Sequence, residues 1–287
     1  MKIGVALSGG GIRGIAHAGV LQALEDYHIP INIIGGTSAG SMIASLYAMG
    51  YSPYVIYLLC QRNAERIVRE NNFSFMKRFF SFQSKGNDRL TGMKDGKMIE
   101  EIYDRLAERK QITSISQIKM PLVIPAVDIM KSKEYVFTNY LPKKAVDEKQ
   151  YITDISIGKA VRASSSFPAV FNPCYVNSHA FMDGGMLDNV PVYEVKKQGA
   201  DKVLAVKFDA DKIDENSNFM DIGMKTIDIM GNKIAEENLE MSDYVLSVYT
   251  DKCGLLDVDK LDQCYQYGYE SVQKNIKQIK QIFLNDI

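Results

Sequence analysis

Three short turns hold residues whose types and spacing could catalyse attack on a carbonyl group. Residues 36–40 read Gly-Thr-Ser-Ala-Gly, the G-x-S-x-G spacing in which a sharp strand-to-helix turn exposes a serine hydroxyl. Residues 9–14 form a glycine-rich loop, and two glycines follow Asp183. A nucleophile, a set of backbone N–H donors and a carboxylate are together the groups that acyl transfer requires.

Ser38 is the candidate nucleophile. It follows the apolar residues 31–34, which predict a strand, and precedes an apolar stretch that predicts a helix. Gly36 and Gly40 are supporting residues, because larger side chains would collide with the tight backbone of such a turn. The alternative is an ordinary helix start that the hydroxyl of Ser38 or Thr37 caps. The position between strand and helix favours the nucleophile.

The glycine loop of residues 9–14 allows two interpretations, because its G-x-G-x-x-G spacing is shared by dinucleotide-binding loops. That interpretation needs an acid about 20 residues further on, and the second predicted strand ends in Ile34-Gly35-Gly36 without one. An oxyanion-binding loop needs only inward-facing backbone N–H groups and the positive end of the following helix. We therefore favour an oxyanion loop, whose candidate donors are the amides of Gly9, Gly10, Gly11 and Ala39.

The base that activates the serine should be a carboxylate. The chain has three histidines, His17, His28 and His179, and none follows Asp183, whereas the usual order in α/β-hydrolases is serine, acid, histidine. The first two lie on and at the end of a predicted helix, and the third lies in a predicted hairpin over residues 175–182. Asp183 ends an apolar strand. An Asp-Gly β-turn is its alternative role, and the combination of three turns favours the base.

Arg13, Gly184 and Gly185 are predicted to support these groups. The two glycines leave room beside Asp183 for a substrate or another backbone segment. Arg13 either braces the glycine loop or contacts an anionic head group, and a surface salt bridge is the alternative.

Apolar periodicity predicts an α/β fold with a mainly parallel sheet, because residues 2–49 alternate strand, helix, strand and helix. Residues 65–89 have the weakest pattern. No domain boundary is evident, so one domain over residues 1–287 is expected. Further strands are predicted at Leu122–Val127, Glu134–Phe137, Ala180–Met182, Lys202–Val206 and Tyr244–Ser247. Further helices are predicted at Asp95–Arg109, Ile155–Ser164, Pro191–Gln198, Asp221–Met241 and Lys260–Phe283.

Composition argues against several classes of protein. Lys and Arg number 34 and Asp and Glu 35, so the chain lacks the basic surplus of most nucleic-acid binders. The cysteines match no zinc spacing, and we expect reduced, mostly buried thiols in a cytoplasmic protein. They are Cys60, Cys174, Cys253 and Cys264. Residues 27–61 lack Asp, Glu, Lys and Arg, but prolines and glycines interrupt them, which favours a strand, a turn and buried helices over a transmembrane helix.

The three turns resemble those of the patatin-like phospholipase family. The same order of motifs is present, and residues 17–21 and 163–171 support the resemblance, which covers about residues 2–206. Residues 207–287 are expected to complete the domain. The resemblance implies a three-layer α/β/α sandwich and a lipid acyl hydrolase of phospholipase A or lysophospholipase type. It implies a Ser38–Asp183 dyad without histidine, and it implies no metal or cofactor.

In the implied mechanism, Asp183 takes the Ser38 proton, the amides of Gly10, Gly11 and Ala39 stabilise the oxyanion, and water then releases the fatty acid. A soluble carboxylesterase or thioesterase with the same dyad is one alternative. A nonenzymatic lipid-binding regulatory protein is another, and the intact dyad argues against it. The expected partner is a phospholipid or another acyl-ester lipid, with no nucleic acid. Transient contact with a membrane surface, the lipid class and the oligomeric state stay open.

Two apolar clusters allow a structural and a functional interpretation. Five phenylalanines within residues 73–82, flanked by basic side chains, could form an interfacial flap or an acyl-pocket wall. A helix that packs on the core, with a solvated basic edge, is the favoured interpretation. The methionines Met220, Met224, Met230 and Met241 are expected to pack against the core rather than to line an acyl channel.

Overall fold

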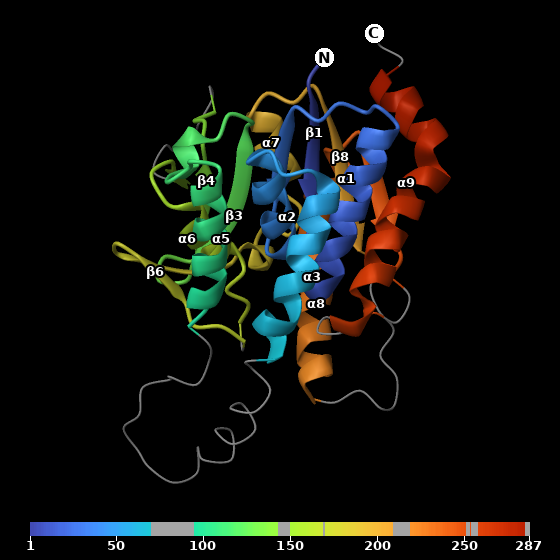
Figure 1. Cartoon of the computed structure of the whole chain (residues 1–287). Coiled ribbons are helices and arrows are strands. Elements are labelled where there is room, and N and C mark those ends of the chain that lie inside the picture. Colours follow the sequence, from blue (N-terminus) through green and yellow to red (C-terminus); the bar gives the residue numbers. More distant parts are fainter. Residues whose placement is uncertain are drawn as a thin grey trace.

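The structure is a computed structural model that describes residues 1–69, 95–142, 150–168, 170–208, 219–250, 253 and 258–284. Within helices α3 and α8 it describes only the backbone of residues 65–69, 219–225, 227 and 228. A sheet with helices on both faces forms this part of the chain (Figure 1). The phenylalanine cluster of residues 73–82 lies outside the described residues.

The strands form one mixed sheet in the order β5-β4-β3-β2-β1-β8-β9, with the β6–β7 hairpin joined to β3. Their bounds are β1 Ile3–Leu7, β2 Ile33–Gly36, β3 Leu122–Asp128, β4 Lys133–Thr138, β5 Tyr151–Ile152, β6 Cys174–Val176, β7 His179–Asp183, β8 Lys202–Phe208 and β9 Tyr244–Val248. The pairs among β3, β2, β1, β8 and β9 are parallel, whereas β4 and β7 run antiparallel to β3. Because β1 and β2 are parallel, the glycine loop and Ser38, which follow these strands, both lie at the carboxyl end of the sheet's parallel strands.

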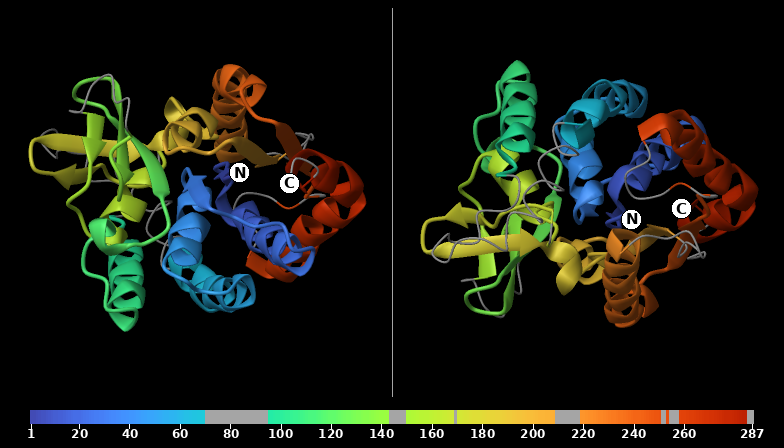
Figure 2. Two further views of the ribbon diagram at one scale, coloured as in Figure 1. Left: turned by 90° about the horizontal axis from the view of Figure 1, so that it is seen from above. Right: turned by 90° about the horizontal axis from the view of Figure 1, so that it is seen from below.

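Helices cover both faces of this sheet, as the views along its edge show (Figure 2). One face is covered by α1, α2, α3, α5, α6 and α9, and the other by α7 and α8. Their bounds are α1 Ala16–Asp26, α2 Ala39–Ala48, α3 Pro53–Arg69, α5 Lys97–Arg109, α6 Ile157–Ser164, α7 Val192–Lys197, α8 Phe219–Glu240 and α9 Leu261–Leu284. The described residues therefore form the predicted three layers around a mainly parallel sheet.

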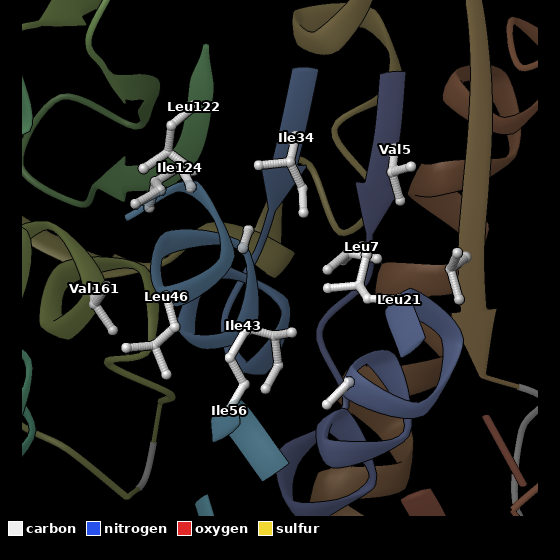
Figure 3. Packing of buried hydrophobic residues seen from close by; sticks show 14 of the residues in the cluster. Val5, Leu7, Leu21, Ile34, Ile43, Leu46, Ile56, Leu122, Ile124 and Val161 are labelled. Atoms are coloured by element: carbon white, nitrogen blue, oxygen red, sulfur yellow. The ribbon is translucent and has the colours of Figure 1, made fainter. Parts of the chain in front are cut away.

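The larger core lies between the sheet and α1, α2 and α9. Residues of β1 and β2 meet residues of α1 and α2 there, and their side chains are almost fully buried (Figure 3). Residues of α9 belong to the same cluster. Runs that are buried on both faces, such as Val5, Ala6 and Leu7, are typical of central parallel strands. This packing fixes the strand ends from which the glycine loop and the Ser38 turn leave the sheet.

Helix α9 packs closely on α1 because each contributes a glycine at the contact. A Cβ atom at Gly19 would overlap the carbonyl oxygen of Tyr265, and one at Gly268 would overlap the carbonyl oxygen of Ala16. A larger side chain at either position would push the helices apart. The last helix of the chain is thereby fixed against the helix that follows the glycine loop.

The predicted strands and helices are confirmed, with ends shifted by one or two residues. The exception is α1, which begins at Ala16 after the 3-10 helix Gly11–Ile15, whereas the sequence predicts a helix from Ile12. The expectation of buried helices in residues 27–61 is wrong for the outer side of α3, where Tyr54, Val55 and Leu58 are exposed. The four cysteines are free, as expected. None of the described helices is long and apolar enough to cross a membrane.

The methionine prediction fails where it can be checked. Met230 is 58% exposed and Met241 37% exposed, so neither packs into the core. The reason is that Gly231 and Ala235 occupy the inner side of α8, where small residues allow a close approach to the rest of the chain. The side chains of Met220 and Met224 lie outside the described residues.

Candidate active site

Ser38 stands at a sharp turn between β2 and α2. Its backbone has φ 52° and ψ −122°, a conformation that residues other than glycine rarely adopt and that often marks a functional site. Its side chain makes no capping hydrogen bond to α2. The Thr37 hydroxyl donates instead to the carbonyl oxygen of Asp188 at 2.8 Å. Ser38 is partly buried, and neither hydroxyl caps α2, which does not support the capping alternative.

The turn is tight because backbone segments approach one another closely there. A Cβ atom at Gly36 would overlap the backbone of Gly40, and one at Gly40 would overlap the carbonyl oxygen of Leu7. Both predicted supporting glycines are therefore required by close backbone contact.

A run of serines at the end of α6 holds the backbone of the turn. The N–H of Ser38 donates to Oγ of Ser164 at 3.1 Å, and Oγ of Ser165 donates to the carbonyl oxygen of Ser38 at 3.2 Å. The carbonyl oxygen of Ser166 accepts the N–H of Asp183 at 3.0 Å. Three consecutive residues thus position both members of the predicted dyad.

Asp183 is buried at the end of β7, where it is 3% exposed. Its Oδ1 accepts the N–H of Gly185 at 2.9 Å, and its Oδ2 has no hydrogen-bond partner of ordinary length among the described residues. Burial raises the pKa of Asp183 to about 6, although the nearby Ser38 hydroxyl and the Gly185 N–H act to lower it. Asp183 therefore combines one hydrogen-bonded carboxylate oxygen with a second that has no such partner among the described residues.

The glycines of the predicted loop differ in their surroundings. The N–H of Gly9 is engaged by Asn189, at 3.2 Å to the carbonyl oxygen and 3.1 Å to Oδ1. Gly10 packs so closely on the Phe208 ring that a Cβ atom would overlap it, and Gly11 has a φ of 57°. The Gly9 amide, one of the predicted donors, therefore already has acceptors within the chain.

Arg13 braces this loop from inside the protein. Its side chain is almost fully buried, and its Nε donates to the carbonyl oxygen of Gly10 at 3.3 Å. The guanidinium also lies 5.6 Å from the centre of the Phe208 ring, within range of a cation–π interaction. Burial at this level is incompatible with the surface salt bridge considered from sequence.

Two helix N-termini meet beside Ser38. The 3-10 helix η1, Gly11–Ile15, begins in the glycine loop, and α2 begins at Ala39. A Cβ atom at Gly14 would overlap that of Ala39, which shows how closely the two approach. The first N–H groups of a helix have no acceptor within the helix. The amides of Gly11 and Ala39 are therefore suited to stabilise a negative oxygen.

Each histidine has surroundings that explain its presence without catalysis. Nε2 of His17 lies 2.8 Å from the carbonyl oxygen of Ser8, and burial lowers the pKa of this ring to about 4, so it is neutral near pH 7. Nδ1 of His179 lies 2.7 Å from Oδ2 of Asp128. His28 is exposed, with a φ of 60° at the end of α1.

Sequence reasoning gave no role to Asn189 or to the three serines, which proved to hold the site together. The serines lie in residues 163–171, which supported the resemblance, but nothing in a Ser-Ser-Ser run shows which hydroxyl meets a distant backbone. Asn189 lies six residues after Asp183 and two residues before Pro191. A polar side chain in that turn was the available signal. Among the described residues no cluster of His, Cys, Asp or Glu side chains could hold a metal ion.

Comparison with solved structures shows the fold. The chain is similar to VipD from Legionella pneumophila, with a TM-score of 0.50, 14% identity, and coverage of 96% of this chain and 67% of that one. It is also similar to a chain of the heterodimeric ExoU–SpcU complex of Pseudomonas aeruginosa, with a TM-score of 0.52, 18% identity, and coverage of 97% and 51%.

Sequence comparison shows the family. Lysophospholipase NTE1 of Meyerozyma guilliermondii is 31% identical over 215 residues, which are 75% of this chain and 13% of that protein. Lysophospholipase NTE1 of Candida albicans is 27% identical over 295 residues, covering 93% and 19%. The chain thus spans less than a fifth of these two relatives. A family model described as Patatin-like phospholipase matches residues 5–196, more than half of the 287 residues, and the chain belongs to that family.

Proposed function

We propose that this chain is a lipid acyl hydrolase of phospholipase A or lysophospholipase type, with Ser38 as nucleophile and Asp183 as base. One observation carries the proposal: Ser38 stands on a strained strand-to-helix turn beside a buried aspartate whose Oδ2 has no ordinary hydrogen-bond partner. A buried carboxylate with a raised pKa is a better base near neutral pH than a solvated one. No imidazole is needed in this arrangement.

The reaction proceeds in two steps. Oγ of Ser38 attacks the ester carbonyl while its proton passes to Oδ2 of Asp183, and the developing oxyanion is stabilised by the amides of Gly10, Gly11 and Ala39. The tetrahedral intermediate collapses to an acyl-serine, and the leaving alcohol takes a proton from Asp183. Asp183 then takes a proton from water, whose oxygen attacks the acyl-serine. When this second intermediate collapses and releases the fatty acid, Asp183 returns the proton to Oγ of Ser38. Loss of one such backbone donor typically costs about 3–4 kcal/mol of transition-state stabilisation.

The names of the relatives support a lipid substrate. Both are named lysophospholipases, and the chain contains the family match within residues 5–196. Because this chain covers a small part of those proteins, the lipid substrate is part of the proposal. We propose a lysophospholipid or phospholipid whose acyl ester reaches Ser38.

Covalent labelling tests the proposal directly. A long-chain fluorophosphonate should modify Ser38 alone, as found by mapping the modified peptide, and the Ser38→Ala variant should lose both labelling and turnover while it keeps its fold. Ser116→Ala, an exposed serine far along the chain, is the matched control and should label normally. Labelling of Ser38→Ala at the rate of the unaltered protein would contradict the assignment of the nucleophile.

Hydrolysis of a defined substrate series separates the lipid hydrolase from a soluble esterase. Lysophosphatidylcholine, phosphatidylcholine and p-nitrophenyl esters of increasing chain length should be compared at equal concentrations of labelled sites. A lipid hydrolase should prefer the long acyl chains and should cleave the lysophospholipid. Activity confined to short, water-soluble esters would favour the carboxylesterase alternative, and labelling without hydrolysis of any ester would contradict the proposed function.

A further inference from the structure

Asn189 lies where the turns of the proposed site meet. The N–H of Gly9 donates to both its carbonyl oxygen and its Oδ1. The carbonyl oxygen of the preceding residue, Asp188, accepts the hydroxyl of Thr37, the neighbour of Ser38. Two consecutive residues therefore tie the segment that follows Asp183 to the glycine loop and to the nucleophile turn.

Three glycines surround the Asn189 side chain. A Cβ atom at Gly9 would lie 2.7 Å from its Oδ1, and one at Gly185 would lie 3.1 Å from the same atom. A Cβ atom at Gly231, on α8, would lie 3.8 Å from its Nδ2. The amide thus fills the space between the glycine loop, the Asp183 turn and α8, and its position is closely defined.

Arg13 and Asn189 hold the glycine loop from different parts of the chain. Arg13 fixes the carbonyl oxygen of Gly10 from within η1, and Asn189 fixes the N–H of Gly9 from a segment 180 residues away. The peptide groups that follow are then limited in the directions their N–H bonds can take. A loop rich in glycine needs such constraints, because glycine itself restricts the backbone least.

We propose that Asn189 is a positioning residue for the reaction, which holds Gly9 so that the amides of Gly10 and Gly11 face the carbonyl group that Ser38 attacks. The proposal rests on the proposed function, since it concerns the same site. Asn189 acts on the reacting atoms through the loop and does not itself donate to the oxyanion.

Two variants test whether the Oδ1 acceptor of Asn189 positions the loop. Asn189→Ala keeps the backbone acceptor but removes Oδ1. A displacement of about 1 Å at a reacting centre can cost on the order of 10²-fold in rate, so kcat should fall by about that factor while KM stays close to its unaltered value. Asn189→Asp keeps the acceptor and the shape, and should recover most of the lost kcat at alkaline pH.

The aspartate variant also carries a signature that loss of packing alone would not produce. Its carboxylate would lie beside Gly185, whose N–H supports Asp183. A second negative charge there raises the pKa of Asp183, so the midpoint of the pH–activity curve should move to higher pH. In Asn189→Ala, which adds no charge, the midpoint should stay where it is.

Asn139 provides a matched control. Its Oδ1 accepts the N–H of Leu122 at 2.8 Å, at the start of β3 and away from the catalytic turns. Asn139→Ala removes this bond and the two that Nδ2 donates to the carbonyl oxygens of Ile118 and Met120, so it should lower the melting temperature without changing kcat or the pH midpoint of the folded protein. All variants should be assayed with a p-nitrophenyl ester and normalised to fluorophosphonate-labelled sites. Hydrogen exchange at the Gly9 amide is measured in parallel.

The exchange measurement keeps this proposal separable from the proposed function. Faster exchange at Gly9 in Asn189→Ala than in Asn139→Ala establishes the anchor, even if the unaltered protein hydrolyses no ester and the proposed function fails. Unchanged exchange at Gly9 overturns the anchor. A folded Asn189→Ala with unaltered kcat overturns the positioning role, as does a loss of activity that matches only the loss of folded protein.

Discussion

Nδ1 of His179 lies 2.7 Å from Oδ2 of Asp128, on the same pair of strands that carries Asp183. In the register of β3 and β7, Ala126 is opposite Asp183, and Asp128 is opposite Phe181. His179 is four residues from Asp183, about 13 Å along an extended strand. The His179 ring therefore interacts with Asp128 rather than with Asp183, and His179 lies at the opposite end of β7 from Asp183.

Replacing the histidines should leave the chemistry in place. His179→Gln and His28→Gln should keep most of the activity per labelled site, because neither ring contacts the dyad in the structure. His17→Gln should lower stability, because His17 is fully buried, but its folded fraction should still be acylated. Fluorophosphonate labelling rates of the three variants check this, and a folded His179→Gln that cannot be acylated would restore a histidine-dependent mechanism.

Asp183→Asn should abolish most of the turnover. The variant keeps the shape of the side chain and its acceptor for Gly185 but cannot take the Ser38 proton, so kcat should fall on the order of 10²–10⁴-fold, as is typical for a lost general base. In the unaltered protein, kcat should rise with pH through a midpoint near 6, because the charged form of Asp183 is the active one and burial raises the pKa of this carboxyl to about 6. Steady-state kinetics across this range provide the measurement, and a flat profile through pH 6 would contradict the base.

The same buried carboxylate should make the folded state less stable at neutral pH. The pKa of Asp183 is about 6 in the folded chain, against an ordinary value of 3.8, so the folded state binds the proton more tightly than the unfolded state. Stability from this group is therefore present below the lower pKa and is lost as pH rises through the higher one, by up to about 3 kcal/mol. Urea unfolding at both ends of this range should show that Asp183→Asn removes this loss, whereas Asp259→Asn, an exposed control, should not.

The serine run at the end of α6 should affect rate more than binding. Ser164→Ala leaves the N–H of Ser38 without its acceptor, and one hydrogen bond contributes about 1 kcal/mol, so kcat should fall roughly fivefold to tenfold with little change in KM. Ser45→Ala is the matched control, because its buried hydroxyl donates within α2 to the carbonyl oxygen of Ser41. Equal effects of the two variants on kcat would show that the α6 serines do not position Ser38.

Much of this fold follows from local pattern. Apolar runs such as Ile3–Leu7 and Lys202–Phe208 could be assigned to buried parallel strands because both faces of such strands are covered. The G-x-S-x-G turn was recognisable because the spacing stands between an apolar strand and an apolar helix, where a sharp turn needs glycines beside the serine. Asp183 could be placed at a strand end because an apolar run precedes it and two glycines follow it.

Relations between distant segments were not predictable from local pattern. The outer position of Met230 depends on Gly231 and Ala235 forming the inner contact of α8, and an apolar sequence does not show which of its sides packs. Asn189 was missed because its partner Gly9 is 180 residues away. The division of the glycine loop into an anchored amide and free amides likewise depends on that contact.

The hydrogen bonds that assemble the site span most of the chain, 126 residues between Ser38 and Ser164 and 180 residues between Gly9 and Asn189. Closing loops of this length costs more entropy than forming a helix or a local hairpin, and such contacts form slowly. During refolding, helical structure should therefore return before reactivity does. The rate at which the refolding protein regains the ability to be acylated should therefore report the formation of these long-range contacts.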